Sequence, residues 1–146
     1  MEIPSTKILN SDITFTSNAL DIDQCQIYII AVPTGIDQSD YPDLDNLKAA
    51  STLVGEHLAI GDLVIYESTV YPGCTEEVCI PLLEKASDLT YNTHFDVAYS
   101  PERINPGNAI DSLKESTKVI GAATSPTSKR AADIYNQILN LSLIHI

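Results

Sequence analysis

The sequence predicts an α/β protein with a parallel sheet and flanking helices. Short apolar runs, each of strand length, recur along the chain and end at polar or proline-containing loops. Segments with apolar residues at helical spacing lie between these runs. Alternation of strands with helices is typical of a parallel sheet, because parallel neighbours need a crossover connection.

Five segments are expected to be strands. Residues 13–16 alternate apolar and β-branched polar side chains, as in a short half-buried strand. Residues 26–32 form a nearly continuous apolar run that ends at Pro33, which is typical of a strand buried on both faces. The other three expected strands are residues 63–66, 95–99 and 118–120.

Three segments are expected to be helices. Asp43 can cap the first, which should run to about Ala59, with Gly61 as the left-handed residue after its end. Thr75 is the expected cap of the second, and acidic residues follow it in the first turn, where the helix dipole favours them. The third, residues 125–139, begins with a serine cap followed by a proline at the first helical position.

Charge and cysteine content exclude several classes of function. The net charge of −12 argues against nucleic acid and anionic membrane as partners. No apolar run reaches the ~18–20 residues of a membrane span, and the first residues lack the pattern of a signal peptide, so we expect a cytoplasmic protein. Cys25, Cys74 and Cys79 fit neither a disulfide framework nor a zinc site, and buried thiols are expected; no metal is predicted.

Polar residues gather just beyond three of the expected strands. The loops are residues 31–35, 67–75 and 100–107, and each combines hydroxyls or charges with proline. In a parallel α/β sheet, ligands bind at the carboxyl ends of the strands. Because proline restricts the backbone, it holds such groups in place before a ligand arrives.

Each candidate side chain in these loops also has a purely structural interpretation. Thr34 and Thr69 could satisfy turn hydrogen bonds, and Glu102 with Arg103 could be a solvated surface pair. Their joint occurrence at successive strand ends favours a ligand site, but the spacing does not identify a reaction.

Three segments resemble the UDP-glucose/GDP-mannose dehydrogenase family: VPTGID, VIYESTVYPGCTEEVCIPLLEK and YSPERINPG. The resemblance covers roughly residues 12–140 and is nearest to the branch that oxidises UDP-N-acetylhexosamines in Vi and O-antigen polysaccharide synthesis. It implies a Rossmann-like NAD-binding domain of a homodimeric oxidoreductase. Such an enzyme oxidises the sugar C6 alcohol to a carboxylate with two NAD, through a thiol-bound aldehyde.

The resemblance also implies roles for individual residues. Thr34 and Thr69 match the threonines that line the NAD site, and Glu102 matches the glutamate near the reacting C6, a catalytic acid–base group. Arg103 and Ile104 match the pair that contacts the nucleotide sugar. A guanidinium suits that task because it forms bidentate, charge-assisted bonds to oxyanions.

Several family features are missing from the sequence. It contains no G-x-G-x-x-G turn and no cysteine in the Gly-rich context of the family's nucleophile, so neither Cys74 nor Cys79 is assigned that role. Gly35 replaces a usual proline, and Lys118 is interpreted as structural. We therefore expect an incomplete sheet without the first βαβ unit, and a chain that is inactive alone.

The domain boundaries follow from this interpretation. Residues 1–140 are expected to be a partial NAD-binding domain. Residues 141–146 can be encoded by a transposon end sequence used in DNA library preparation, and we interpret them as an adaptor-derived tail. Without its first unit, the sheet should expose residues 26–32 as an apolar edge that is prone to aggregation.

Two alternatives remain open. The chain could be a non-catalytic nucleotide-binding remnant, which would bind without turnover. Within the enzyme class, it could belong to a UDP-glucose or UDP-N-acetylmannosamine 6-dehydrogenase, because the residues that would separate these sugars fall largely outside the matched segments.

Overall fold

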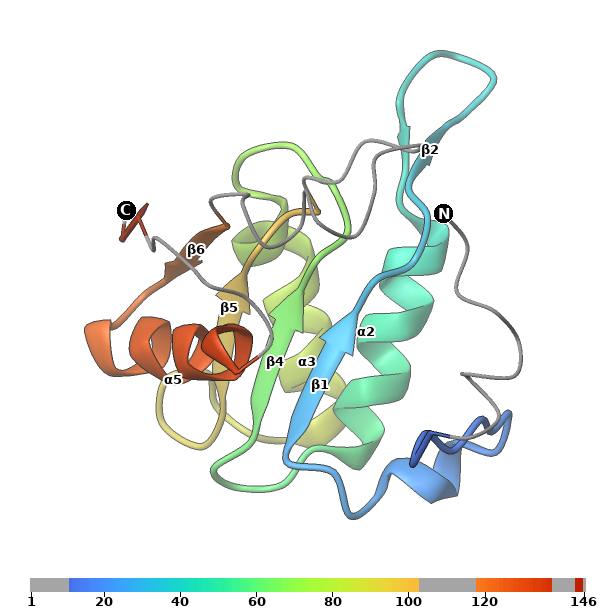
Figure 1. Ribbon diagram of the computed structural model, residues 1–146. Coiled ribbons are helices and arrows are strands. Elements are labelled where there is room, and N and C mark those ends of the chain that lie inside the picture. Colours follow the sequence, from blue (N-terminus) through green and yellow to red (C-terminus); the bar gives the residue numbers. More distant parts are fainter. Residues whose placement is uncertain (1–10, 103–117, 138–143, 146) are drawn as a thin grey trace.

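The protein is described here by a computed structural model that covers residues 11–102, 118–137 and 144–145. Its main sheet has the strand order β1-β4-β5-β6-β7 (Figure 1). These strands are Ile27–Ile30, Leu63–Tyr66, Asp96–Tyr99, Val119–Ala122 and Ile144–His145. In the described residues they are accompanied by the α-helices α2 (Asp45–His57), α3 (Ile80–Ser87) and α5 (Ser125–Asn136).

The parallel sheet expected from the sequence is confirmed for its first three strands. β1 pairs in parallel with β4, and β4 pairs in parallel with β5. β6 departs from this pattern because it runs antiparallel to β5, while the two-residue strand β7 lies parallel to β6. The carboxyl ends of β1, β4 and β5 therefore meet at one edge of the sheet, which is the edge that matters for ligands.

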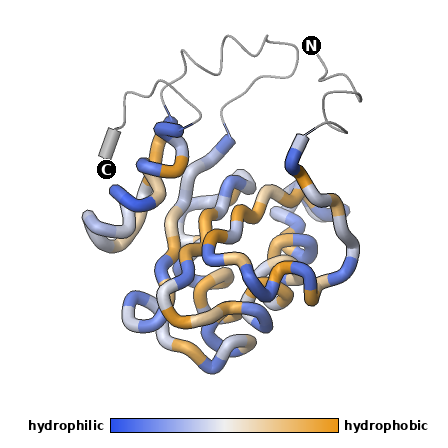
Figure 2. The backbone as a smooth tube through the Cα atoms, turned by 60° about the horizontal axis from the view of Figure 1, so that its bottom comes forward, coloured by the Kyte–Doolittle hydropathy of each residue, from blue (hydrophilic) through white to orange (hydrophobic). Residues whose placement is uncertain are grey.

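The sheet lies between helices, and an apolar cluster fills the space on each of its faces. On one face α2 and α3 cover alternate residues of the strands, including Tyr28, Ile30, Val64 and Val97. On the other face α5 packs on a second cluster that includes Ile65. All four residues of β4 are buried, as expected for a central strand with helices on both faces. Figure 2 shows hydrophobic residues gathered where these elements pack together.

Residues 13–16 do not form the predicted strand. Ile13 and Phe15 are exposed, and Thr16 uses its hydroxyl locally, donating to Asp21. Asn18 then caps the short 3-10 helix η1 (Ala19–Ile22). A β-branched run becomes a strand only where a neighbouring strand pairs with it. Here the segment forms local side-chain hydrogen bonds instead.

The helix starts also differ from the predicted caps. The side chain of Asp43 accepts a bond from the N–H of Asp45, but helix α2 begins at Asp45 and ends at His57, before the predicted end. Thr75 is not a cap; it begins a π-helical turn, η2 (Thr75–Cys79), that leads directly into α3. For α5 the cap is Thr124, one residue earlier than predicted, and its hydroxyl accepts from Thr127.

A small antiparallel hairpin lies beyond the carboxyl end of β1. It consists of β2 (Gly35–Ile36) and β3 (Pro42–Asp43), and it projects from the same end of the molecule as the tips of β1 and β4 (Figure 1). Within the described part of the chain, no helix is long and apolar enough to cross a membrane.

β1 is the edge strand of the described sheet, as predicted from the sequence, but the prediction that it is buried on both faces is wrong. Tyr28 and Ile30 point into the core under α2 and α3, but Ile27 and Ile29 are 40% and 48% exposed on the opposite face. An unpaired, apolar strand edge is a template for association with another chain.

We therefore expect Ile29→Lys to reduce self-association of the chain, because a lysine on an edge strand opposes strand pairing. Sedimentation velocity over a range of protein concentrations measures the effect. Leu53→Lys, at a similarly exposed apolar position on α2, is the control and should leave association unchanged. If both variants self-associated as strongly as the unmodified chain does, the edge-strand interpretation would be contradicted.

The phenol of Tyr28 joins three segments at the opposite end of the sheet. Its oxygen lies 3.0 Å from the carbonyl oxygen of His57, 3.1 Å from that of Cys25 and 3.2 Å from that of Ile22. Burial, together with the charges of nearby groups headed by Asp62, raises the pKa of Tyr28 to about 12.

This shift predicts how stability depends on alkaline pH. A raised pKa in the folded state gives stability that is complete below the unfolded pKa near 10 and is lost as pH rises toward about 12. Tyr28→Phe should be about 1 kcal/mol less stable at pH 7, where it lacks the hydrogen bond, and this deficit should shrink above pH 10. Urea unfolding at a series of pH values measures it, and a deficit that grew with pH would overturn the assignment.

Candidate functional site

The predicted strand-end residues converge on one open hollow. It has a volume of about 490 Å³ and lies at the carboxyl ends of β1 and β4. Thr34, Thr69 and Glu102, the three described residues that the sequence analysis singled out, all contribute to its wall. Its full lining is Ala31, Val32, Pro33, Thr34, Glu67, Ser68, Thr69 and Glu102.

Main-chain and hydroxyl hydrogen bonds lock the two strand ends that form the floor. The N–H groups of Glu67 and Ser68 both donate to the carbonyl oxygen of Ile30, at 2.9 and 3.3 Å. The hydroxyl of Ser68, a buried residue, donates to the carbonyl oxygen of Val32 at 2.7 Å. The loops after β1 and β4 are therefore held together before any ligand binds.

A direct contact joins the two threonines. The hydroxyl of Thr34 donates to the carbonyl oxygen of Thr69 at 2.7 Å, although the residues are far apart in the sequence. Because this bond uses the hydroxyl hydrogen, the oxygen of Thr34 can still accept a bond from a ligand. Thr34 therefore has a structural role, but it joins two loops in the wall of the hollow instead of satisfying its own turn.

Glu102 is held at the rim through its backbone. The N–H of Ser100 donates to the carbonyl oxygen of Tyr66 at 2.8 Å, which extends the pairing of β5 with β4 beyond the strand. Two residues later, the N–H of Glu102 donates to the carbonyl oxygen of Glu67 at 3.2 Å. Arg103 and Ile104, the predicted substrate contacts, lie outside the described residues.

A polar cluster that was not predicted from the sequence lies beside this hollow. The carboxylate of Glu67 accepts from the ammonium of Lys118 at 2.9 Å and from the phenol of Tyr135 at 2.6 Å. Glu67 directly follows a buried strand at the ligand edge, and that position was the signal that could have marked it.

Cys74 and Cys79 are buried as predicted from the sequence, but the prediction is wrong for Cys25, which is exposed. All three thiols are free. Burial is the main cause that raises the pKa of Cys79 to about 11, and burial also raises the pKa of Cys74. A nucleophilic cysteine needs the opposite shift, because the thiolate is the reactive form. Among the described residues, no cluster of His, Cys, Asp or Glu is placed to hold a metal ion.

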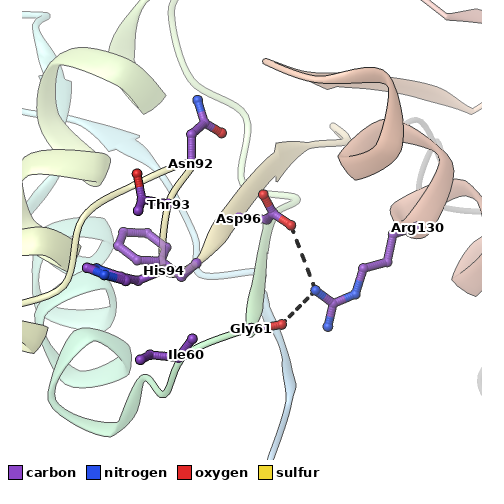
Figure 3. A pocket seen from close by; sticks show the side chains of 8 residues that line it. Ile60, Gly61, Asn92, Thr93, His94, Asp96 and Arg130 are labelled. Carbon is purple, nitrogen blue, oxygen red and sulfur yellow. Dashed lines mark hydrogen bonds and ion pairs between the residues drawn. The ribbon is translucent and has the colours of Figure 1, made fainter.

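A second, smaller hollow of about 170 Å³ lies at the other end of the sheet (Figure 3). There Arg130 of α5 donates to the carbonyl oxygen of Gly61 at 2.7 Å and lies 3.8 Å from the carboxylate of Asp96. Its guanidinium thus ties α5 to the loop before β4 and to the start of β5. Because ligands of such sheets bind beyond the carboxyl ends of strands, the hollow beyond β1 and β4 is the better candidate of these two.

Comparison with known proteins assigns the chain to a family. Residues 2–139 match the UDP-glucose/GDP-mannose dehydrogenase family, NAD binding domain. The chain therefore belongs to this dehydrogenase family. NAD is accordingly the cofactor of the domain, and the Rossmann-like fold that the resemblance implied is confirmed.

Relatives of this dehydrogenase domain include enzymes named for one sugar nucleotide. The UDP-N-acetyl-D-glucosamine 6-dehydrogenase of Salmonella typhi is 47% identical over 126 residues, which cover 86% of this chain and 30% of that protein. The protein of the same name from Pseudomonas aeruginosa is 45% identical, covering 88% of this chain and 31% of the relative. The chain thus spans about a third of the length of these relatives.

A solved structure of the family supports the fold. The UDP-D-ManNAc dehydrogenase from Pyrococcus horikoshii superposes with a TM-score of 0.83 at 32% identity, over 89% of this chain and 31% of that one. A dehydrogenase named for a different sugar nucleotide therefore shares the fold of this chain.

Proposed function

We propose that this chain is part of a UDP-N-acetylhexosamine 6-dehydrogenase that oxidises the C6 alcohol of the sugar to a carboxylate with two NAD. In this proposal the hollow beyond β1 and β4 receives the nicotinamide end of NAD and the C6 end of the substrate. The observation that carries the proposal is the convergence of Thr34, Thr69 and Glu102 on that one hollow.

The lining of the hollow fits the nicotinamide end of the cofactor. Ala31, Val32 and Pro33 offer apolar surface for a flat ring, while hydroxyl and carbonyl oxygens beside them can accept bonds from a carboxamide. No lysine or arginine occurs among these lining residues, so this part of the site suits the nicotinamide rather than the pyrophosphate. When bound, NAD accepts hydride from the substrate carbon.

Glu102 is the group assigned to proton transfer. A carboxylate on a backbone held at the rim of the hollow can accept the proton of the C6 hydroxyl as hydride leaves, which is general-base catalysis. Thr34 and Thr69 orient the cofactor beside it. Arg103 and Ile104 are proposed to contact the nucleotide sugar, and an arginine there would counter the charge of the diphosphate.

The sugar proposed here is a UDP-N-acetylhexosamine, with UDP-N-acetylglucosamine first. The two relatives that carry this substrate in their names are 45% and 47% identical to the chain, against 32% for the UDP-D-ManNAc dehydrogenase structure. Because of this difference in identity, we rank UDP-N-acetylglucosamine above UDP-N-acetylmannosamine as the proposed substrate.

A chimera tests the proposal. The chain replaces the matching segment of the Salmonella typhi enzyme, and NADH formation is followed with UDP-N-acetylglucosamine, UDP-N-acetylmannosamine and UDP-glucose. We expect turnover with UDP-N-acetylglucosamine, and two NADH for each sugar oxidised. A folded chimera that binds NAD without turnover would reject the proposal and favour the non-catalytic binding module instead.

A further inference from the structure

Three side chains from separate parts of the chain form a closed polar cluster beside the hollow. Glu67 follows β4, Lys118 precedes β6 and Tyr135 belongs to α5. Besides their two bonds to the Glu67 carboxylate, the ammonium of Lys118 lies 4.5 Å from the centre of the Tyr135 ring, in a cation–π contact. Each member therefore contacts both others, and we call this group the Glu67 triangle.

The Glu67 triangle is shielded from water. The side chains of Lys118 and Glu67 are only 10% and 17% exposed, and Tyr135 belongs to the buried cluster under α5. Burial and the bond to Glu67 raise the pKa of Tyr135, and the charges of Glu67 and Glu102 add to the effect. The phenol consequently stays protonated and continues to donate its bond, and Glu102 lies within electrostatic reach of it.

The backbone of Glu67 connects the triangle to the proposed catalytic site. Its N–H donates to Ile30 at the end of β1, and its carbonyl oxygen accepts from the N–H of Glu102. Ser100, two residues before Glu102, is held by other groups, because its hydroxyl donates at 3.0 Å to the carbonyl oxygen of Val119 and its N–H donates to Tyr66. If the backbone of Glu67 shifts when its side-chain bonds are lost, the carbonyl oxygen that holds Glu102 moves with it.

Stability alone is a weak reason for this arrangement. A shielded ion pair costs desolvation of both charges, and apolar residues of similar size stabilise a protein as well or better. What a hydrogen-bonded polar cluster adds is one defined geometry, because each hydrogen bond forms only over a narrow range of distances and angles. That property matters most next to a group that must be placed for chemistry.

We propose that Glu67 is a positioning residue for Glu102, held in place by Lys118 and Tyr135. The proposal deepens the proposed function and rests on it for the role of Glu102, but the positioning itself can be measured without any activity. Glu67 acts through its carbonyl oxygen and takes no part in the reaction.

The test measures exchange of individual backbone amides with water by NMR in the full chain. Glu67→Ala removes both side-chain bonds of the carboxylate, and Tyr135→Phe removes only the phenol hydroxyl and is the milder change. Both should speed exchange of the Glu102 amide about tenfold or more, while the Ser100 amide, bonded to Tyr66, stays as slow as before. Tyr28→Phe, which deletes the same atom at the other end of the sheet, should leave the Glu102 amide unchanged.

Two results would overturn the positioning role. One is an unchanged Glu102 amide in both variants, and the other is an equal acceleration at Ser100 and Glu102, which reports general loosening of the fold. In the chimera, Tyr135→Phe should lower kcat and leave KM for NAD unchanged. If Glu102 exchange rises but kcat does not fall, the positioning holds and the catalytic assignment of Glu102 fails.

Discussion

Glu102→Gln is expected to lower kcat of the chimera with UDP-N-acetylglucosamine by about 10²–10⁴-fold, the usual loss when a general base is removed. Glutamine has nearly the same shape as glutamate and keeps the backbone bond to Glu67, but it cannot accept a proton. KM for NAD should change little, because the cofactor contacts are assigned to Thr34 and Thr69. Steady-state kinetics of NADH formation measures both parameters.

The control for this prediction is Glu56→Gln. Glu56 lies on the exposed side of α2, away from the hollow, and its replacement removes the same charge from the chain. Because the chain carries a net charge of −12, the control separates the loss of one specific carboxylate from a general change in the electrostatic field. If Glu102→Gln kept more than a tenth of the activity, Glu102 would not be the acid–base group.

Much of the fold could be predicted because its signals are local. The apolar run of β4 is buried on both faces. In a chain whose other segments have apolar residues at helical spacing, such a short continuous run predicts a buried strand. Residues 13–16 have an equally good strand pattern, yet they are not a strand, because strand formation depends on a partner that the pattern does not reveal. The antiparallel direction of β6 was hidden for the same reason.

The candidate site was likewise predictable from the sequence only in part. Thr34, Thr69 and Glu102 could be grouped in advance, because parallel strands bring their carboxyl ends to one edge. The Glu67 triangle could not, since Lys118 and Tyr135 reach Glu67 across 51 and 68 residues of sequence. Nothing local to a lysine before a strand or a tyrosine in a helix indicates which carboxylate it will meet.

Gly55→Val is expected to lower the free energy of unfolding by about 3 kcal/mol, the upper part of the usual range for overpacking. Gly55 lies inside α2 at the point where this helix contacts α3. A Cβ atom there would lie 2.7 Å from the Cβ of Ala86 and 3.1 and 3.2 Å from the backbone O and Cα of Leu83. Backbone atoms cannot rotate away as a flexible side chain can, so the two helices would have to separate.

Helix propensity acts in the opposite direction but is the smaller effect. Valine is better than glycine inside a helix by only a few tenths of a kcal/mol, and alanine by about 1 kcal/mol. Gly55→Ala should therefore lose less than Gly55→Val, because it adds one atom to the contact and gains more propensity. Gly35→Val is the matched control: no atom lies within 4 Å of its added Cβ, so it should change stability by no more than about 0.5 kcal/mol.

Urea unfolding followed by circular dichroism ranks the three variants, with equal slopes required for the comparison. A Gly55→Val chain as stable as the unmodified one would show that α2 and α3 can move apart at no cost. The result also bears on the site, because α2 follows directly on the β2–β3 hairpin and Asn46 in its first turn reaches the carbonyl oxygen of Pro33 at 3.5 Å. If α2 must shift to accommodate valine, amide signals of Thr34 should shift with it, whereas those of Glu102, held from β4, should not.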